Sequence, residues 1–340
     1  MPGARGLDVD AAVHGLAGAI GGVLAIGLFF PLEVLRTRLQ VGDPSVVALA
    51  AGKAQRPGPW GALLRIARRE GPGALYRGFY AVLVTVGASQ FVYFCAYREL
   101  KQLFAVAYLS PASPVANLAM AGAAGAVTVL LTTPLWLVNT RMKVQRTPAA
   151  WRARGGDAEA QGEAACAAPY RSLSGGLLRI WREEGLATLW DGTVPSLILV
   201  SSPAIQWAVY EFEKECLAEL HPSAPPSHIE TFVAAALAKA IATMATYPLQ
   251  VAQAALQCNG SSPGRHSEDG PDIARKRYGG TVDCLVKLYH AGGVPRLFRG
   301  LQAKMLQTVL TAAFHIMCYE KIVIVLTALL GASHGLGAPT

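Results

Sequence analysis

A proline followed at fixed offsets by charged residues is the pattern in this sequence best suited to chemistry. Within Phe30–Gln40, Pro31 is followed by Glu33, Arg36 and Arg38. The proline, which disturbs a helix, stands where an uncharged run gives way to charge. On a helix, this spacing places Glu33 and Arg36 on neighbouring turns of one face. Because such side chains pair with opposite charges and attract anions, the pattern indicates ion pairing and anion attraction.

Related proline motifs occur twice more along the chain, with Trp136 and Gln250 in place of the acid and Asn139 and Gln253 in place of the first base. Pro134 lies 103 residues after Pro31, and Pro248 lies 114 residues after Pro134. We therefore predict tandem repeats. The predicted bounds are 11–106, 112–219 and 227–330, followed by a frayed tail over 331–340.

Each proline motif is followed by a polar loop and then by a short amphipathic stretch. The loops are Gly42–Pro59, Arg146–Pro169 and Cys258–Arg277, of which the second is of low complexity and predicted to be disordered. The amphipathic stretches are Leu63–Gly71, Leu177–Gly185 and Leu285–Leu288. Their apolar and basic faces are typical of helices that lie at a membrane interface.

Composition indicates a membrane protein that is entirely helical. Of the 340 residues, 52% are hydrophobic and only 15% are charged, and the mean hydropathy is +0.34. Runs of about 20 apolar residues span a bilayer. We predict six spans within Val13–Leu32, Phe79–Tyr97, Leu103–Thr140, Gly192–Tyr210, Thr231–Gln257 and Met305–Leu330. The alternative, a large soluble protein with buried helices, fits the bunched charges poorly.

The charge and the motif content exclude several function classes. The net charge is +8, and the basic residues gather after the proline motifs. Such segments set membrane topology or line a pore that attracts anions, and no soluble basic face suits nucleic acid. The six cysteines lack CxxC pairs and the seven histidines lack metal-ligand spacing. With no nucleophile–base pair and no Walker motif, we predict no catalytic residue, metal site or bound prosthetic cofactor.

The repeated motif resembles the signature of the mitochondrial carrier family. It reads Pro-x-acid-x-x-base-x-base, a polar gap, and acid-Gly-x-x-x-x-aromatic-base-Gly. Repeat one matches it in full at Pro31, Glu33, Arg36, Arg38, Glu70, Gly71, Tyr76, Arg77 and Gly78. The resemblance implies a six-helix barrel with threefold pseudosymmetry around one central site that opens alternately to either side.

Four further segments resemble the branch of this family that includes peroxisomal carriers of coenzyme A, flavin and adenine nucleotides. They are Leu131–Trp136, Pro203–Gln206, Ala238–Ala242 and Lys304–Phe314. The resemblance implies exchange of anionic cofactors (CoA, FAD, FMN, NAD, AMP or ADP) across the peroxisomal membrane. It also implies a monomer in the lipid bilayer, inserted with the help of a peroxin import receptor. The alternatives are a mitochondrial inner-membrane carrier of a related nucleotide, flavin or folate, and a non-transporting scaffold.

The resemblance implies an inner gate built from the proline motifs. Its residues are Pro31, Glu33, Arg36, Pro134, Trp136, Asn139, Pro248, Gln250 and Gln253. In the family, the acid of each motif faces the first base of the next repeat. Here those pairs are Glu33 with Asn139, Trp136 with Gln253, and Gln250 with Arg36. Since none pairs an acid with a base, we predict a weak polar gate without a salt bridge.

An outer gate is implied by the pattern aromatic-acid-x-x-base on the even-numbered helices. Its residues are Tyr97, Lys101, Tyr210, Glu211, Lys214, Tyr319 and Glu320. The copy from Tyr210 to Lys214 fits the pattern fully. The copy at Tyr97 lacks the acid, and the copy at Tyr319 lacks the last base.

Lys239 is the charged residue that stands out within a predicted span, nine residues before Pro248. A charge at membrane depth is costly and usually faces a cavity or a partner. We predict that Lys239 is a counter-charge for phosphate, with a structural cation as the alternative. Family contact points map to Thr85, Leu199, Val200 and Gln307, with Gln206 and Lys304 as secondary candidates. The alternative for each of them is ordinary helix packing.

Overall fold

Long helices build most of the molecule. The structure, a computed structural model, describes residues 4–42, 59–108, 114–145, 170, 172–220, 228–259 and 278–335. The long helices are α1 (Ala4–Val41), α4 (Phe79–Tyr108), α5 (Pro114–Val144), α10 (Ser202–Leu220), α11 (His228–Gln257) and α14 (Leu301–Gly335). The shorter ones are α3 (Pro59–Glu70), η1 (Pro72–Tyr76), α8 (Leu173–Glu184), η2 (Leu186–Trp190), α9 (Thr193–Leu199), α12 (Thr281–His290) and α13 (Gly293–Leu297).

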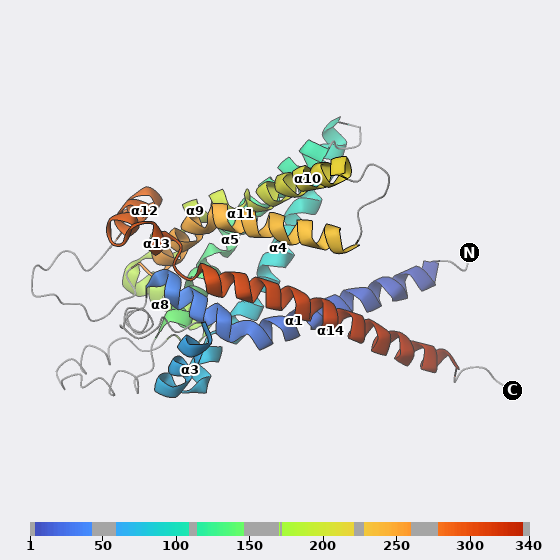
Figure 1. Cartoon of the computed structure of the whole chain (residues 1–340), viewed down its shortest axis with the longest axis horizontal. Helices are drawn as coiled ribbons and strands as arrows, with labels where there is room; N and C mark the ends of the chain where they lie inside the picture. Colours follow the sequence, from blue (N-terminus) through green and yellow to red (C-terminus); the bar gives the residue numbers. More distant parts are fainter. Residues whose placement is uncertain are drawn as a thin grey trace, which may run out of the picture.

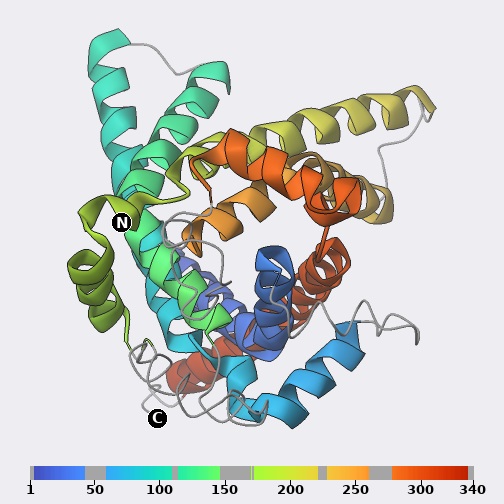
Figure 2. The same ribbon diagram turned by 90° about the vertical axis from the view of Figure 1, so that its left-hand side faces the viewer.

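The long helices form pairs that converge at one end of the molecule. The most extensive contacts join α1 with α14, α4 with α5, and α10 with α11. The pairs meet where α3, α8 and α12 lie, here named the closed end, and diverge toward the termini, here named the open end (Figure 1). Viewed from the closed end, α1, α5 and α11 surround the centre (Figure 2). The predicted six-helix fold in three repeats is therefore confirmed.

Five segments of the described chain are long and apolar enough to cross a membrane. They are Val13–Val41, Pro72–Phe104, Ala116–Val144, Leu186–Leu217 and Gly293–Thr327. The remaining long helix, α11, is not among the five. It carries Pro248 inside its length, as α1 carries Pro31 and α5 carries Pro134, so it is their counterpart in the third repeat.

The predicted span Gly192–Tyr210 is interrupted rather than continuous. The helix stops between α9 and α10, where the amides of Val200 and Ser201 bond the carbonyls of Leu197 and Ile198. Pro203, at the second position of α10, has no amide hydrogen with which to continue the α-helical ladder across this point. Prolines elsewhere in the long helices do not interrupt them in this way.

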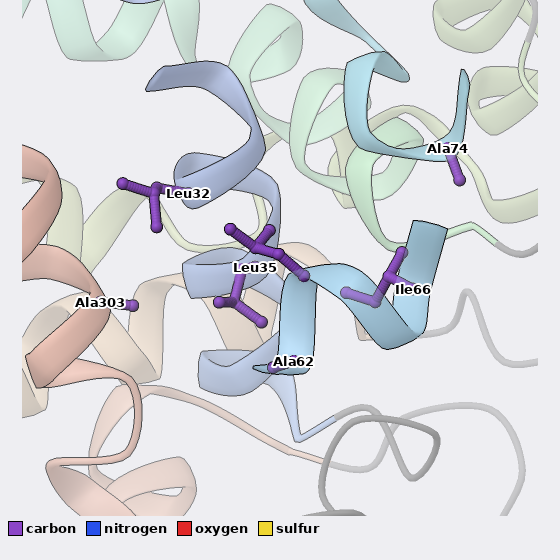
Figure 3. Close-up of a cluster of buried hydrophobic side chains, with 7 residues drawn as sticks. Leu32, Leu35, Ala62, Ile66, Ala74 and Ala303 are labelled. Atoms are coloured by element: carbon purple, nitrogen blue, oxygen red, sulfur yellow. The ribbon is translucent and has the colours of Figure 1, made fainter. Parts of the chain in front are cut away.

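The predicted amphipathic stretches form α3, α8 and α12, and each packs beside the end of a proline-motif helix. In the first repeat, Ala62 and Ile66 of α3 pack against Leu32 and Leu35 of α1 and Ala303 of α14 (Figure 3). Corresponding clusters join α8 to α5 and α12 to α11. These contacts fix the closed end, because each short helix buries its apolar face against the motif helix of its own repeat.

The predicted loops and the predicted frayed tail can be compared with the structure only in part. The predicted loops lie largely outside the described residues. At the carboxyl end, α14 continues to Gly335. The predicted frayed tail is therefore wrong for residues 331–335, which extend the last helix, while 336–340 lie outside the described residues.

Shortening a core side chain at the closed end should destabilise the protein. Leu35 is fully buried, whereas Leu28 on the same helix is 52% exposed. We expect Leu35→Ala to lower stability by ~2–5 kcal/mol, because it leaves a cavity. Leu28→Ala should shift stability by less than ~1 kcal/mol. Thermal unfolding of the purified protein in detergent measures both, and equal shifts would contradict the assigned core.

The thiol of Cys284 should be inert while α12 stays packed on α11. Cys284 is fully buried in the cluster that joins these helices, and burial raises the pKa of its thiol to about 12. Because the thiolate is the reactive species, a variant with Cys284 as its single cysteine should react with a maleimide ~100-fold more slowly than one with only Cys216. Cys216 is exposed on α10. Similar rates for the two variants would show that α12 lifts readily from α11.

Candidate functional site

A polar cavity of about 300 Å³ lies at the closed end between α1, α4, α5, α9 and α11. Five of the predicted inner-gate residues line it, namely Glu33, Arg36, Trp136, Gln250 and Gln253. Residues that were not predicted also line it, among them Ser89, Thr140, Lys143, Ser196 and Gln257. The structure thus brings residues of all three proline motifs together around one polar space.

An ion pair between α1 and α5 closes one side of this cavity. The Nζ of Lys143 lies 2.5 Å from Oε1 of Glu33, and the two side chains are only 5% and 18% exposed. The prediction of a gate without a salt bridge is therefore wrong. The base is present one helical turn beyond Asn139, the position where it was sought. Residues four apart lie on the same face of a helix, so Lys143 reaches the carboxylate in its place.

Asn139 does not pair with Glu33, contrary to the prediction. It is fully buried, and neither its Oδ1 nor its Nδ2 has a partner among the described residues. A buried amide without partners costs about 1–3 kcal/mol for each unsatisfied group. Asn139 is therefore an energetically unfavourable residue close to the ion pair that joins α1 and α5.

The other two predicted gate pairs also bond elsewhere. The indole Nε1 of Trp136 donates to Ser89 Oγ at 3.1 Å, and Gln253 Nε2 donates to Ser196 Oγ at 2.7 Å. Gln250 Nε2 donates to its own helix at Thr246, 3.3 Å away. Arg36 Nε reaches Gln40 Oε1 at 3.4 Å. The neutral side chains lack long-range attraction and bond to near neighbours, and Arg36 finds no acid at Gln250 with which to pair.

Two fully buried arginines tie successive repeats together near this cavity. Arg38 binds both carboxylate oxygens of Glu70, at 2.6 and 3.0 Å, and its Nε donates to the carbonyl of Lys143 at 3.1 Å. Arg141 binds both oxygens of Glu184 and donates to the carbonyls of Gln257 and Asn259. Each guanidinium therefore bonds a carboxylate of its own repeat and the carboxyl end of the next motif helix, where a cation is favourable.

The third repeat lacks both members of this arrangement. Ala255 stands at the position of the buried arginine, seven residues after Pro248, and Gly292 replaces the acid. The guanidinium of Arg296 on α13 instead lies against Gly42, where α1 ends. A side chain at Gly42 would meet this guanidinium, and the positive φ of 80° also favours glycine there. The contact between the third and first repeats is thus built differently from the other two.

Lys239 and Gln206, both predicted substrate residues, lie together toward the open end. Lys239 Nζ donates to Gln206 Oε1 at 3.0 Å, joining α11 to α10, and Lys239 is exposed. Lys304 on α14 lies where the charges of Arg36, Glu33 and Lys239 all act on it. We refer to the cavity lining together with Gln206, Lys239 and Lys304 as the central path.

The remaining predicted contact residues have different surroundings. Thr85 is fully buried and its hydroxyl donates to Ala81 O at 2.7 Å, so its role in binding stays a prediction beside the packing alternative. Val200 lies against Gly125 of α5, where an added Cβ would come within 2.8 Å of it. Leu199 is half-buried at the end of α9. Gln307 keeps a buried Oε1 with no partner among the described residues.

The predicted outer-gate residues lie on the diverging helices and do not meet one another. Tyr97 stacks on Tyr93 at 6.1 Å, and the hydroxyl of Tyr319 lies 2.9 Å from His14 Nδ1. Lys101, Lys214 and Glu320 are exposed, while Tyr210 and Glu211 are half-buried. No ion pair joins these residues within the described chain. Their gating role stays a prediction, since this end is open.

Lys143 was not predicted because it lies beyond the positions that the motif assigns to charged residues. The position nine residues after the proline carries Gln40, Lys143 and Gln257 in the three repeats. All of them line the cavity. Lys143 could have been identified because it is the one basic residue at this position, where the other two repeats carry glutamine. It also lies in the repeat whose first base is replaced by Asn139.

Reversing Lys143 should weaken the closed end, and reversing Glu33 as well should restore it. Breaking a buried ion pair costs ~3–5 kcal/mol, because one charge stays buried without a partner. We expect Lys143→Glu to lower the thermal unfolding midpoint, and Glu33→Lys combined with Lys143→Glu to recover at least half of the loss. The control is Lys287→Glu, which breaks an exposed pair with Asp283 and should cost less than ~1 kcal/mol. No recovery in the double variant would contradict the pair.

Comparison with known proteins agrees with this architecture. A family model described as mitochondrial carrier protein matches residues 8–107, 110–220 and 224–328. Peroxisomal membrane protein PMP34 of Mus musculus is 37% identical, over 93% of this chain and 94% of its own length. The peroxisomal nicotinamide adenine dinucleotide carrier of Arabidopsis thaliana is 30% identical over 92% and 96%.

A mitochondrial relative is similar to nearly the same extent. Nicotinamide adenine dinucleotide transporter 2, mitochondrial, of Arabidopsis thaliana is 32% identical, over 92% of this chain and 78% of its own length. The three matched repeats account for nearly the whole chain. Each of them places its proline motif at the closed end of the helical barrel. The chain therefore belongs to the mitochondrial carrier protein family.

Proposed function

We propose that this chain is a secondary transporter that exchanges nucleotide-like anionic cofactors, such as CoA, FAD, FMN, NAD, AMP and ADP, across the peroxisomal membrane. The observation that carries the proposal is the charge of the central path. Arg36, Lys143, Lys239 and Lys304 provide four basic groups, and Glu33 is the acid among them. A polar space with excess positive charge attracts phosphorylated solutes.

The arrangement of the helices supports transport by alternating access. Every contact that seals the closed end lies near a proline motif, and the pairs diverge toward the open end (Figure 1). A single ion pair joins proline-motif helices among the described residues, between Glu33 and Lys143. Opening this end must therefore separate that ion pair and the hydrogen bonds that Arg38 and Arg141 donate to the next repeat.

Names of relatives support the location and the substrate class. Two of the relatives reported above are peroxisomal, and two are named as carriers or transporters of nicotinamide adenine dinucleotide. A dinucleotide combines adenine, ribose and phosphates, and so do CoA and FAD. The proposed substrates therefore share one chemistry, an aromatic ring system joined through a sugar or sugar alcohol to one or more phosphates.

Several features of the protein's working state complete the proposal. The chain acts as a monomer in the lipid bilayer, without catalysis and without a bound prosthetic cofactor, so nucleotide cofactors are its cargo. A peroxin import receptor assists its insertion. The second candidate function is a mitochondrial inner-membrane carrier for a related nucleotide or a flavin- or folate-type substrate, which the mitochondrial relative favours.

Uptake into liposomes that hold the purified protein tests the proposal. We expect labelled CoA, FAD, NAD and ADP to enter vesicles preloaded with AMP, and a simple carboxylate to stay outside. Lys239→Ala should reduce uptake at least ~10-fold, because it removes a phosphate counter-charge from the central path. The matched control is Lys287→Ala, which removes an exposed lysine on α12 and should leave uptake unchanged.

Uptake of the carboxylate alone, or of no solute, would contradict the proposed substrate class. Equal uptake by empty and preloaded vesicles would contradict exchange. Fluorescence microscopy of the tagged protein in cells distinguishes the peroxisomal from the mitochondrial candidate.

A further inference from the structure

Trp136 occupies an unusual environment for a tryptophan. It lines the polar cavity at the closed end and is the only aromatic residue among the described residues that line it. The other lining side chains carry hydroxyl, amide or charged groups, except Val129 and Ala254. An indole ring contributes most by packing against apolar neighbours. The cavity supplies few of them, so core packing does not explain this residue.

The ring is held in place by a single polar contact at its edge. Nε1 donates to Ser89 Oγ at 3.1 Å, which joins α5 to α4. Gln253, the side chain predicted to face Trp136, bonds to Ser196 instead. Within the described residues, none of the observed aromatic or cation–ring contacts involves Trp136. With its edge anchored on Ser89 and its side chain at the wall of the cavity, the indole can serve as a preformed platform.

The charges around the platform indicate which ligand would fit it. Arg36 and Lys143 line the same cavity. Because Lys143 is paired with Glu33, Arg36 is the basic group of the cavity lining that remains for an anion. A ligand with a flat aromatic ring at one end and phosphate at the other matches both features, since aromatic side chains stack on any nucleobase.

We propose that Trp136 is a specificity-determining residue, which stacks on the base of a nucleotide while the phosphates lie toward Arg36. This inference rests on the proposed function and adds the part of the site that recognises the base. It also explains why the second proline motif carries tryptophan where the first carries Glu33 and the third Gln250. The competing role, a hydrophobic plug of the closed end, would affect all ligands equally.

Binding of AMP and of ribose 5-phosphate to the full-length protein in detergent separates the two roles. The two ligands share a sugar and a phosphate, and only AMP has a base. By calorimetry, we expect Trp136→Leu to weaken AMP binding ~10-fold or more and to leave ribose 5-phosphate binding unchanged. Trp136→Phe, which keeps a ring, should stay within ~3-fold of the wild type for AMP. The matched control is Trp207→Leu, on an exposed position of α10.

Intrinsic tryptophan fluorescence gives a second measurement, for which the conservative variant Trp136→Phe is sufficient. The chain has six tryptophans, and a stacked base quenches the indole beneath it. AMP should quench part of the wild-type emission, and the quenching should be absent in Trp136→Phe and retained in Trp207→Phe.

The outcomes distinguish this inference from the proposed function. Equal weakening of AMP and ribose 5-phosphate in Trp136→Leu, or unchanged AMP affinity, would overturn the stacking role while leaving nucleotide transport intact. Quenching retained in Trp136→Phe would overturn it as well. Failure of the wild-type protein to bind AMP at all would overturn the proposed function, and with it the inference.

Discussion

The closed end depends on placing two guanidinium groups where water cannot reach them. The side chains of Arg38 and Arg141 are fully buried, and an isolated buried charge is strongly unfavourable. Each is compensated by a carboxylate and by carbonyl groups at the end of the next motif helix. Each arginine bonds the acid of its own repeat and the carbonyl groups of the next repeat. These arginines therefore stabilise both the fold of a single repeat and its packing against the next one.

The three contacts between repeats are not equivalent, and the site reflects this. The first and second repeats also share the ion pair of Glu33 with Lys143. The third repeat has Ala255 and Gly292 where the others have an arginine and an acid, and it meets the first through Arg296 and Gly42. The boundary between the second and third repeats has no such ion pair between its motif helices among the described residues and depends on hydrogen bonds, including those of Arg141 to the carbonyls of Gln257 and Asn259.

Loss of charge from two of the gate motifs also changes what the cavity can bind. In a ring of acid–base pairs, each basic group is neutralised by its partner. Here Trp136 and Gln250 take the places of two acids, so Arg36 has no carboxylate partner within the described residues. The same substitutions that weaken the gate therefore leave a cation and an aromatic face for a nucleotide.

The sequence by itself determined the repeats, the spanning helices and the family, because hydrophobic period and proline spacing are local properties of the chain. It also identified Lys239 and Gln206, which the structure places in contact. The partner of Glu33 was decided only by tertiary structure, since Asn139 and Lys143 lie on one face of α5 and only the fold shows which side chain reaches across. Burial of Thr85 and the break before Pro203 likewise depend on how neighbouring helices pack, which spacing along a single chain does not encode.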